Sequence, residues 1–181
     1  MFRAQVLWIT GLSGAGKSTL AREVASRLRA RGEPVVLLDG DELRGVFGAV
    51  AANARNHDRE GRLALAMKYA RLCQIIARQD LTVVIATISL LNEVHAWNRV
   101  NLPGYFEVYL KVPLEELGRR DPKGLYRRFR EGDIRHVAGL DMPIDEPQAA
   151  DWVETFQAGR TPDVIAEALL DHWYEEQQHE N

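Results

Sequence analysis

The sequence predicts a three-layer α/β fold, with helices on both sides of a mostly parallel sheet of about five strands. Four short apolar runs rich in Val, Ile and aromatic residues have the composition of buried strands, at residues 6–10, 35–38, 82–88 and 106–112. Segments with helical spacing of apolar residues separate these runs. With 181 residues, 46% of them hydrophobic, the chain suits one domain with one core.

Apolar faces between these runs predict the helices. The first helix ends near Gly32 and Pro34, and its buried face should be Leu20, Ala21, Val24, Ala25 and Leu28. A longer helix before the third strand should bury Leu63, Ala66, Ala70, Cys73 and Ala77. A weak fifth strand is expected at residues 152–155. Thr161 and Pro162 then begin a C-terminal helix that should turn Val164, Ile165, Ala168 and Leu169 inward.

The glycine-rich loop at residues 11–18 carries the first chemical signal. It reads GLSGAGKS, matches G-x-x-x-x-G-K-[ST], and lies directly between a predicted strand and a predicted helix. Glycines at 11, 14 and 16 let backbone N–H groups face phosphate oxygens, Lys17 reaches the outer phosphates, and the Ser18 hydroxyl is placed for Mg²⁺. The loop therefore predicts a P-loop NTPase fold that binds ATP.

Two carboxylates, Asp39 and Asp41, follow the second predicted strand. We expect this strand to lie next to the first, so that both carboxylates point into the phosphate crevice. There they would hold Mg²⁺ through water and accept a proton from an acceptor hydroxyl, whereas the alternative is a pair of turn carboxylates. The D-x-x-G letters at residues 58–61 lie in the approach to a helix, which argues against a GTPase switch.

A basic cluster follows the fourth strand and a short helix begun at Pro113. Residues 119–135 contain seven bases against three acids. One interpretation is a solvated helix face; the other is a lid, at approximately residues 119–136, that closes over the phosphates and stabilises the transferring phosphoryl group. We predict a single P-loop kinase domain over residues 1–181 that includes this lid.

Composition excludes several other classes. A net charge of −3 argues against a nucleic-acid surface, and one cysteine, Cys73, cannot form an internal disulfide. The five histidines show no zinc-site spacing. The apolar run near the N-terminus is too short for a signal peptide or a membrane span, so we expect a cytoplasmic protein that binds no membrane.

Further motifs, together with the glycine-rich loop, span roughly residues 7–145. In these motifs the chain resembles the adenylylsulfate (APS) kinases. The matching segments are residues 8–19, 38–44, 58–59, 88–89, 112–115, 120–126 and 139–143. The resemblance implies ATP-dependent phosphorylation of the ribose 3′-hydroxyl of APS with Mg²⁺, by a family whose members are commonly dimeric.

The resemblance also implies roles for individual residues. The implied catalytic residues are Lys17, Asp39 and Asp41, with Ser18 and Asp39 on the metal side. The implied ATP contacts are Gly11, Ser13, Gly14, Ala15, Gly16, Lys17, Ser18, Thr19 and Arg119. The implied acceptor contacts are Arg44, Arg59, Arg62, Ile88, Ser89, Lys123, Gly124 and Leu125.

The acceptor side departs from the family pattern. APS kinases typically stack the acceptor adenine between two phenylalanines, but residues 50–57 contain no aromatic ring except His57, and the second position is Val137. These changes, with the segments at 89–99 and 105–110, are similar to APS-kinase-like enzymes such as cytidine diphosphoramidate kinase. APS and a cytidine-linked nucleotide therefore both stay open as acceptors. A non-catalytic nucleotide-binding module is the alternative of another class, and the full set of Lys17, Ser18, Asp39 and Asp41 argues against it.

Overall fold

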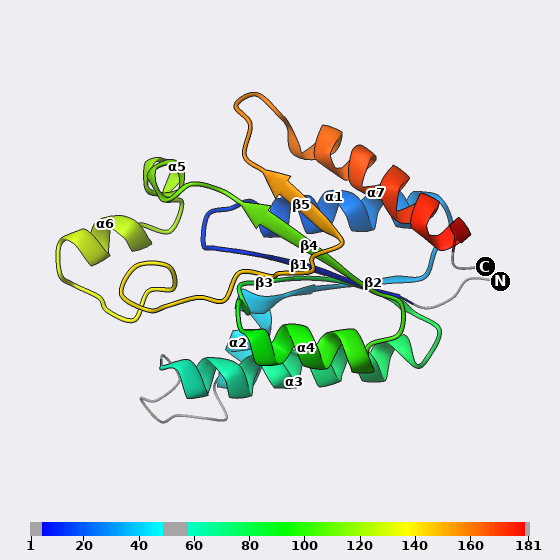
Figure 1. Cartoon of the computed structure of the whole chain (residues 1–181), viewed down its shortest axis with the longest axis horizontal. Coiled ribbons are helices and arrows are strands. Elements are labelled where there is room, and N and C mark those ends of the chain that lie inside the picture. Colours follow the sequence, from blue (N-terminus) through cyan, green and yellow to red (C-terminus); the bar gives the residue numbers. More distant parts are fainter. Residues whose placement is uncertain (1–4, 49–57, 180–181) are drawn as a thin grey trace.

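The computed structural model describes residues 5–48 and 58–179, which form one sheet between two layers of helices (Figure 1). All pairings in the sheet are parallel, and the strand order is β2-β3-β1-β4-β5. The strands are β1 (Val6–Gly11), β2 (Val35–Asp39), β3 (Thr82–Thr87), β4 (Tyr105–Lys111) and β5 (Trp152–Thr155). The predicted fold class and all five strands are confirmed, with bounds that differ by a residue or so.

The position of β2 differs from the prediction. We expected it next to β1, but β3 lies between them, and β2 pairs with β3 through Val35–Thr82 and Asp39–Ala86. Every residue of β3 is buried, as in a central strand, whereas β2 is half-buried along its whole length, as at a sheet edge. The order of the strands along the chain does not show which of two apolar strands, β2 or β3, lies next to β1.

Helices cover both faces of the sheet. On one face lie α1 (Lys17–Ala30) and α7 (Pro162–His179), and on the other lie α2 (Gly40–Gly48), α3 (Arg59–Ala77) and α4 (Asn92–Asn101). Two short helices, α5 (Leu114–Arg120) and α6 (Leu125–Arg130), extend beyond the carboxyl ends of the strands (Figure 1). None of the helices in these described ranges is long and apolar enough to cross a membrane.

The helix faces follow the predicted pattern except at Leu63 of α3, which is half-buried rather than buried, and on α7. The five apolar residues expected to face the core from α1 are all buried, and α3 buries Ala66, Ala70, Cys73 and Ala77 as expected, together with Tyr69. On α7 the inward stripe is rotated, because Ala166, Leu169, Leu170 and Trp173 are buried while Val164 is 48% exposed. Val164 lies in the first turn of α7.

The start of α3 accounts for the D-x-x-G letters. Asp58 is the N-cap of this helix, and its Oδ1 accepts a hydrogen bond of 2.8 Å from the backbone N–H of Gly61. A carboxylate in this position satisfies one of the N–H groups left free at a helix start. The motif is therefore a helix cap.

Candidate functional site

The glycine-rich loop turns sharply between β1 and α1. Gly14 has φ 81° and Gly16, the N-cap of α1, has φ 99°, a region that residues with a Cβ adopt at a cost. Since α1 begins at Lys17, its free N–H groups and positive dipole end face the space above the strand ends. This backbone is shaped to bind an anion.

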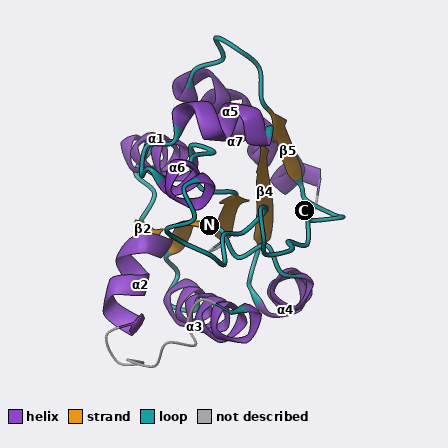
Figure 2. Cartoon of the chain, turned by 90° about the vertical axis from the view of Figure 1, so that its left-hand side faces the viewer, coloured by secondary structure: helices purple, strands orange, loops and turns teal. Residues whose placement is uncertain are grey.

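A cleft of about 620 Å³ opens at this end of the molecule. Figure 2 shows the elements at this end of the molecule, with α5 and α6 toward the top and α2 and α3 toward the bottom. Its walls come from the glycine-rich loop, the β2–α2 junction, α3, the β3–α4 connection, the α5–α6 turn and the segment after α6. Most residues expected to bind ATP or the acceptor line it: Ser13, Gly14, Gly16, Lys17, Ser18, Thr19, Asp39, Asp41, Arg44, Arg59, Arg62, Ile88, Ser89 and Lys123.

Lys17 lies in the loop with its ammonium turned back onto the backbone. Its Nζ donates a hydrogen bond of 2.8 Å to the carbonyl oxygen of Leu12. Desolvation, with the positive charge of Lys123 adding to it, lowers the pKa of Lys17 to about 8, although Asp41 and Asp39 act in the opposite direction. An incoming phosphate would restore the charged form of Lys17 by supplying negative charge.

Ser18 and Asp39 form the second element of the loop. The Ser18 hydroxyl donates to Asp39 Oδ2 at 2.5 Å, and Asp39 Oδ1 accepts the Asp41 backbone N–H at 2.9 Å. Burial raises the pKa of Asp39, but the hydrogen bonds from Ser18 and from Asp41 outweigh it, so the pKa lies below its ordinary value. Asp39 is therefore held as a carboxylate although β2 lies one strand further from β1 than expected.

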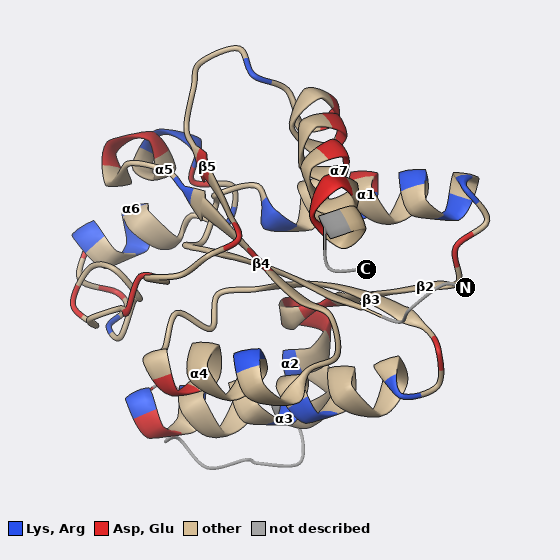
Figure 3. Ribbon diagram, turned by 45° about the vertical axis from the view of Figure 1, so that its right-hand side comes forward, with Lys and Arg blue, Asp and Glu red and all other residues tan. Residues whose placement is uncertain are grey.

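Asp41 faces the basic segment across the cleft. Its carboxylate forms an ion pair with Lys123 in the α5–α6 turn, and both side chains are more than half exposed, at 64% and 55%. Figure 3 shows basic residues along α6, which lies beyond the strand ends. The pair joins α2 to the predicted lid segment.

The three arginines expected to bind the acceptor all line the cleft, but each has neighbours of its own. Arg59 makes two hydrogen bonds to Glu93, of 2.7 and 2.9 Å, and one of 3.1 Å to Asp145. Arg62 donates to the carbonyl oxygen of His136. Burial and the nearby charge of Arg44 lower the pKa of Arg62. The arginines form a cationic wall opposite the glycine-rich loop.

Arg119 does not reach the cleft, contrary to the expectation that it contacts ATP. Its guanidinium pairs with Glu116 at 2.7 Å and is 73% exposed. Its neighbour Arg120 lines the cleft instead, 3.3 Å from the carbonyl oxygen of Gly14 and 4.9 Å from the centre of the Phe156 ring. Successive residues of a helix point about 100° apart, so these two neighbouring arginines extend in different directions.

Four other expected contacts lie beside the cleft. Gly11 and Ala15 are buried behind the loop, and Gly124 and Leu125 begin α6. Sequence reasoning missed several residues that do line the cleft: Tyr69, Leu90, Leu91, Arg120, Ala138, Met142, Pro143 and Ile144. Of these, Arg120, Met142 and Pro143 fall inside the motifs that carried the resemblance, so a signal existed for them.

Aromatic side chains are scarce on the acceptor side. The first position of the expected phenylalanine clamp falls in residues 49–57, outside the described residues, and Val137 at the second position is buried. Among the described residues, Tyr69 is the one aromatic residue lining the cleft, and its hydroxyl donates to the carbonyl oxygen of Gly40 at 3.1 Å. No phenylalanine of the described chain lines it.

Comparisons with known proteins give the family of the chain. The family model of adenylylsulphate kinase matches residues 3–154. The chain is 37% identical to a cytidine diphosphoramidate kinase of Campylobacter jejuni, over 80% of this chain and 82% of that one. It is also 37% identical to an adenylyl-sulfate kinase of Pseudomonas aeruginosa, over 94% and 85%.

A solved structure gives the same result. The Mycobacterium tuberculosis APS kinase, in complex with AMPPNP and APS, superposes with a TM-score of 0.82 at 32% identity, over 95% of this chain and 98% of that one. These matches confirm the expected family and the reaction class that goes with it, transfer of a phosphoryl group to a hydroxyl. The chain belongs to the adenylylsulphate kinase family.

Proposed function

We propose that this chain transfers the γ-phosphoryl group of ATP to a ribose hydroxyl of a small, anionic, nucleotide-like acceptor. The observation that carries the proposal is the single cleft in which Lys17 and Ser18 face Asp41 and the arginines Arg44 and Arg59. One end offers backbone N–H groups and a lysine for a triphosphate, and the other offers a carboxylate and guanidinium groups for an acceptor.

The phosphate end fits Mg²⁺. Mg²⁺ prefers oxygen ligands and usually keeps waters and substrate phosphates in its coordination shell. Ser18 and Asp39 supply a hydroxyl and a carboxylate side by side, and the described residues contain no cluster of three or more metal-ligating side chains. When bound with ATP, the ion would neutralise charge on the outer phosphates. Ser18 and Asp39 would hold it, while Lys17 stabilises the transferring group.

Asp41 is the group assigned to the acceptor hydroxyl. Its carboxylate is exposed to the cleft, and in the free protein this carboxylate forms an ion pair with Lys123. For Asp41 to accept a proton, Lys123 must move to another anion, which the acceptor or the phosphates would supply. The exchange of partners would couple movement of the predicted lid to chemistry.

APS is the first acceptor to test, because the family model is named for its kinase. A cytidine-linked diphosphate such as cytidine diphosphoramidate is the second candidate, and the lack of phenylalanine among the described residues that line the cleft favours it. Stacking a base on an aromatic ring contributes about 1–3 kcal/mol, so a site without the clamp should lose about tenfold or more in APS affinity. A smaller pyrimidine ring depends less on stacking from both sides.

The test is ADP release from ATP with APS or cytidine diphosphoramidate, alone and in competition. Acceptor-dependent ADP release, with one phosphate added to the acceptor by mass spectrometry, is the expected result. Arg44→Gln should raise the acceptor KM and leave the KM for ATP unchanged, whereas Arg78→Gln, at an exposed position after α3, serves as the control. ADP release at the same rate with and without either acceptor would contradict the proposal.

Efficient phosphorylation of APS at micromolar concentration, with no response to the cytidine compound, would show that the missing phenylalanines do not matter. The reverse preference would assign the acceptor to the pyrimidine class. A homodimer and a cytoplasmic location remain predictions of the resemblance, and light scattering on the purified protein tests the first.

A further inference from the structure

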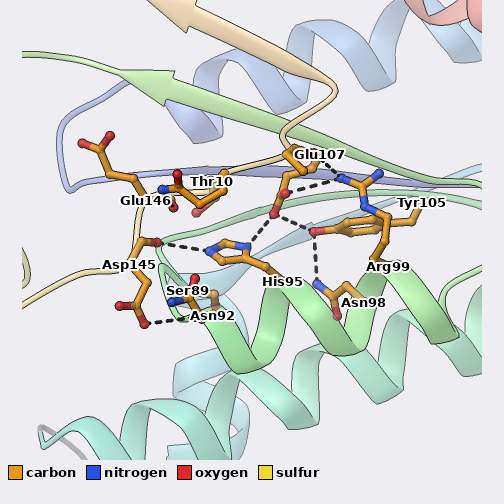
Figure 4. A network of polar contacts seen from close by, with 12 residues as sticks. Thr10, Ser89, Asn92, His95, Asn98, Arg99, Tyr105, Glu107, Asp145 and Glu146 are labelled. Carbon is orange, nitrogen blue, oxygen red and sulfur yellow. Dashed lines mark hydrogen bonds and ion pairs between the residues drawn. The ribbon is translucent and has the colours of Figure 1, made fainter.

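A polar network lies behind the acceptor side of the cleft, in the core between β4 and α4 (Figure 4). Its centre is Glu107 on β4, which is 2% exposed. A buried carboxylate is costly unless it is hydrogen-bonded. His95 Nδ1 lies 2.5 Å from Glu107 Oε1, and the Tyr105 hydroxyl donates to the same oxygen at 2.8 Å. The Arg99 guanidinium lies 3.6 Å from Oε2, so the carboxylate is fully partnered.

The other nitrogen of His95 points to a different part of the chain. Nε2 lies 3.3 Å from the backbone carbonyl oxygen of Asp145 (Figure 4). A carbonyl oxygen only accepts hydrogen bonds, so a hydrogen bond between these two atoms has Nε2 as its donor. One imidazole ring therefore connects β4 to residue 145.

Asp145 is held from several sides. Its backbone N–H donates to the Leu90 carbonyl oxygen at 3.0 Å, and its carboxylate accepts the Asn92 N–H at 3.0 Å and Arg59 at 3.1 Å. These partners lie in the β3–α4 connection and at the starts of α3 and α4, around the mouth of the cleft. The contact with His95 is the one among them that connects Asp145 to the interior of the sheet.

Residues 138–145, which we call the wall segment, form one side of the cleft. Ala138, Met142, Pro143 and Ile144 line it, and Asp145 ends the segment. Asp145 follows these lining residues directly, and its carboxylate also pairs with Arg59. A small movement of Asp145 would therefore change the space left for an acceptor without touching the glycine-rich loop.

We infer that His95 is a positioning residue for the acceptor. Through Nε2 it fixes Asp145, and with it the wall segment and Arg59, while through Nδ1 it is itself oriented by Glu107. The inference rests on the proposed function in assigning this side of the cleft to the acceptor. The anchoring of the wall segment does not depend on which acceptor is used.

Two substitutions separate the roles of the two ring nitrogens. In His95→Asn the amide nitrogen occupies the place of Nδ1 and keeps the contact with Glu107, but nothing reaches Asp145. In His95→Gln the longer amide occupies the place of Nε2 and keeps the contact with Asp145. His172→Asn, at a half-exposed ring on α7 that pairs with Glu176 at 3.3 Å, is the matched control.

Hydrogen exchange without any ligand tests the anchor. The amides of the wall segment should exchange about two- to tenfold faster in His95→Asn than in His95→Gln, as expected for the loss of one hydrogen bond. Acceptor KM should rise by a similar factor in His95→Asn alone, with kcat and the KM for ATP unchanged. Equal exchange, or equal acceptor KM, in the two variants would overturn the inference.

The exchange measurement also separates this inference from the proposed function. If the wild-type protein phosphorylates neither acceptor, the proposed function fails, and hydrogen exchange still decides whether His95 holds the wall segment. If His95→Asn does not fold, nitrogen NMR of the wild-type histidines decides. The His95 Nε2–H should then be present and protected from exchange with water, and an unprotonated Nε2 would contradict the anchor.

Discussion

The lowered pKa of Lys17 makes ATP affinity depend on pH in a defined direction. In the free protein this pKa is about 8, because the ammonium is desolvated and lies near Lys123. Bound phosphates favour the charged form, so the pKa of Lys17 is higher in the complex. Below pH 8 the Lys17 side chain is already mostly charged in the free protein. Above that value binding must take up a proton, so affinity falls as pH rises.

The magnitude follows from the pKa. Lys17 is about nine-tenths charged at pH 7 and about one-tenth charged at pH 9, so the ATP dissociation constant should rise about tenfold over this interval, or about 1.4 kcal/mol. Isothermal titration calorimetry from pH 6.5 to pH 9.5, in two buffers of different ionisation enthalpy, measures both the affinity and the proton uptake. Uptake should approach about one proton per ATP at the upper end.

Lys17→Arg is the control for this titration, because a guanidinium stays charged over the whole interval. The variant should bind ATP more weakly, since its planar fork differs in shape from an ammonium, and the extra pH dependence should vanish. Titration of the nucleotide or of other residues appears equally in both proteins and cancels in the comparison. Parallel affinity profiles for Lys17 and Lys17→Arg would refute the reasoning.

Three further results are expected. Asp41→Asn should lower kcat far more than it changes the ATP dissociation constant, because a proton acceptor acts mainly in the transition state. Steady-state kinetics together with equilibrium binding measures both quantities. An unchanged kcat with weaker ATP binding would assign Asp41 to binding. ATP with Mg²⁺ should slow tryptic cleavage within residues 119–136, and cleavage indifferent to nucleotide would favour a solvated helix face over a lid. In urea denaturation Gly40→Ala should destabilise by about 1–3 kcal/mol, since its Cβ would lie 3.0 Å from Thr87 Oγ1. Gly45→Ala, in open space on the same helix, should stabilise by up to about 1 kcal/mol, and equal effects would contradict the packing argument.

The phosphate side of the cleft could be predicted because it is local. Residues 11–18 are contiguous, and the glycines that permit the turn, the lysine and the hydroxyl all fall within one motif. Asp39 was found by its place after a strand, and it reaches Ser18 even though β2 is not next to β1. The carboxyl ends of parallel strands meet at one edge of the sheet whatever their order, so the error in strand order did not affect the site.

Other features depend on distances that the sequence does not contain. Whether Arg119 or Arg120 lines the cleft depends on how α5 is rotated about its axis. This helix has seven residues, too few for the spacing of its apolar residues to predict that rotation. The network of His95, Glu107 and Asp145 joins residues separated by 12 and 50 positions, and each of them alone is typical of a helix, a strand or a loop. A lone histidine on a helix carries no sign that both of its nitrogens are engaged.

The two sides of the cleft are built in different ways, and this bears on the acceptor. On the phosphate side, most of the expected contacts come from the backbone of one loop. Side chains of α2, α3 and the wall segment line the side that we propose for the acceptor, and none of them belongs to the loop. The chain is 37% identical both to a cytidine diphosphoramidate kinase and to an adenylyl-sulfate kinase. Overall identity therefore does not separate the two acceptors, whereas the side chains around Arg44, Arg59 and the wall segment would, because we propose that they contact the base and the anion of the acceptor.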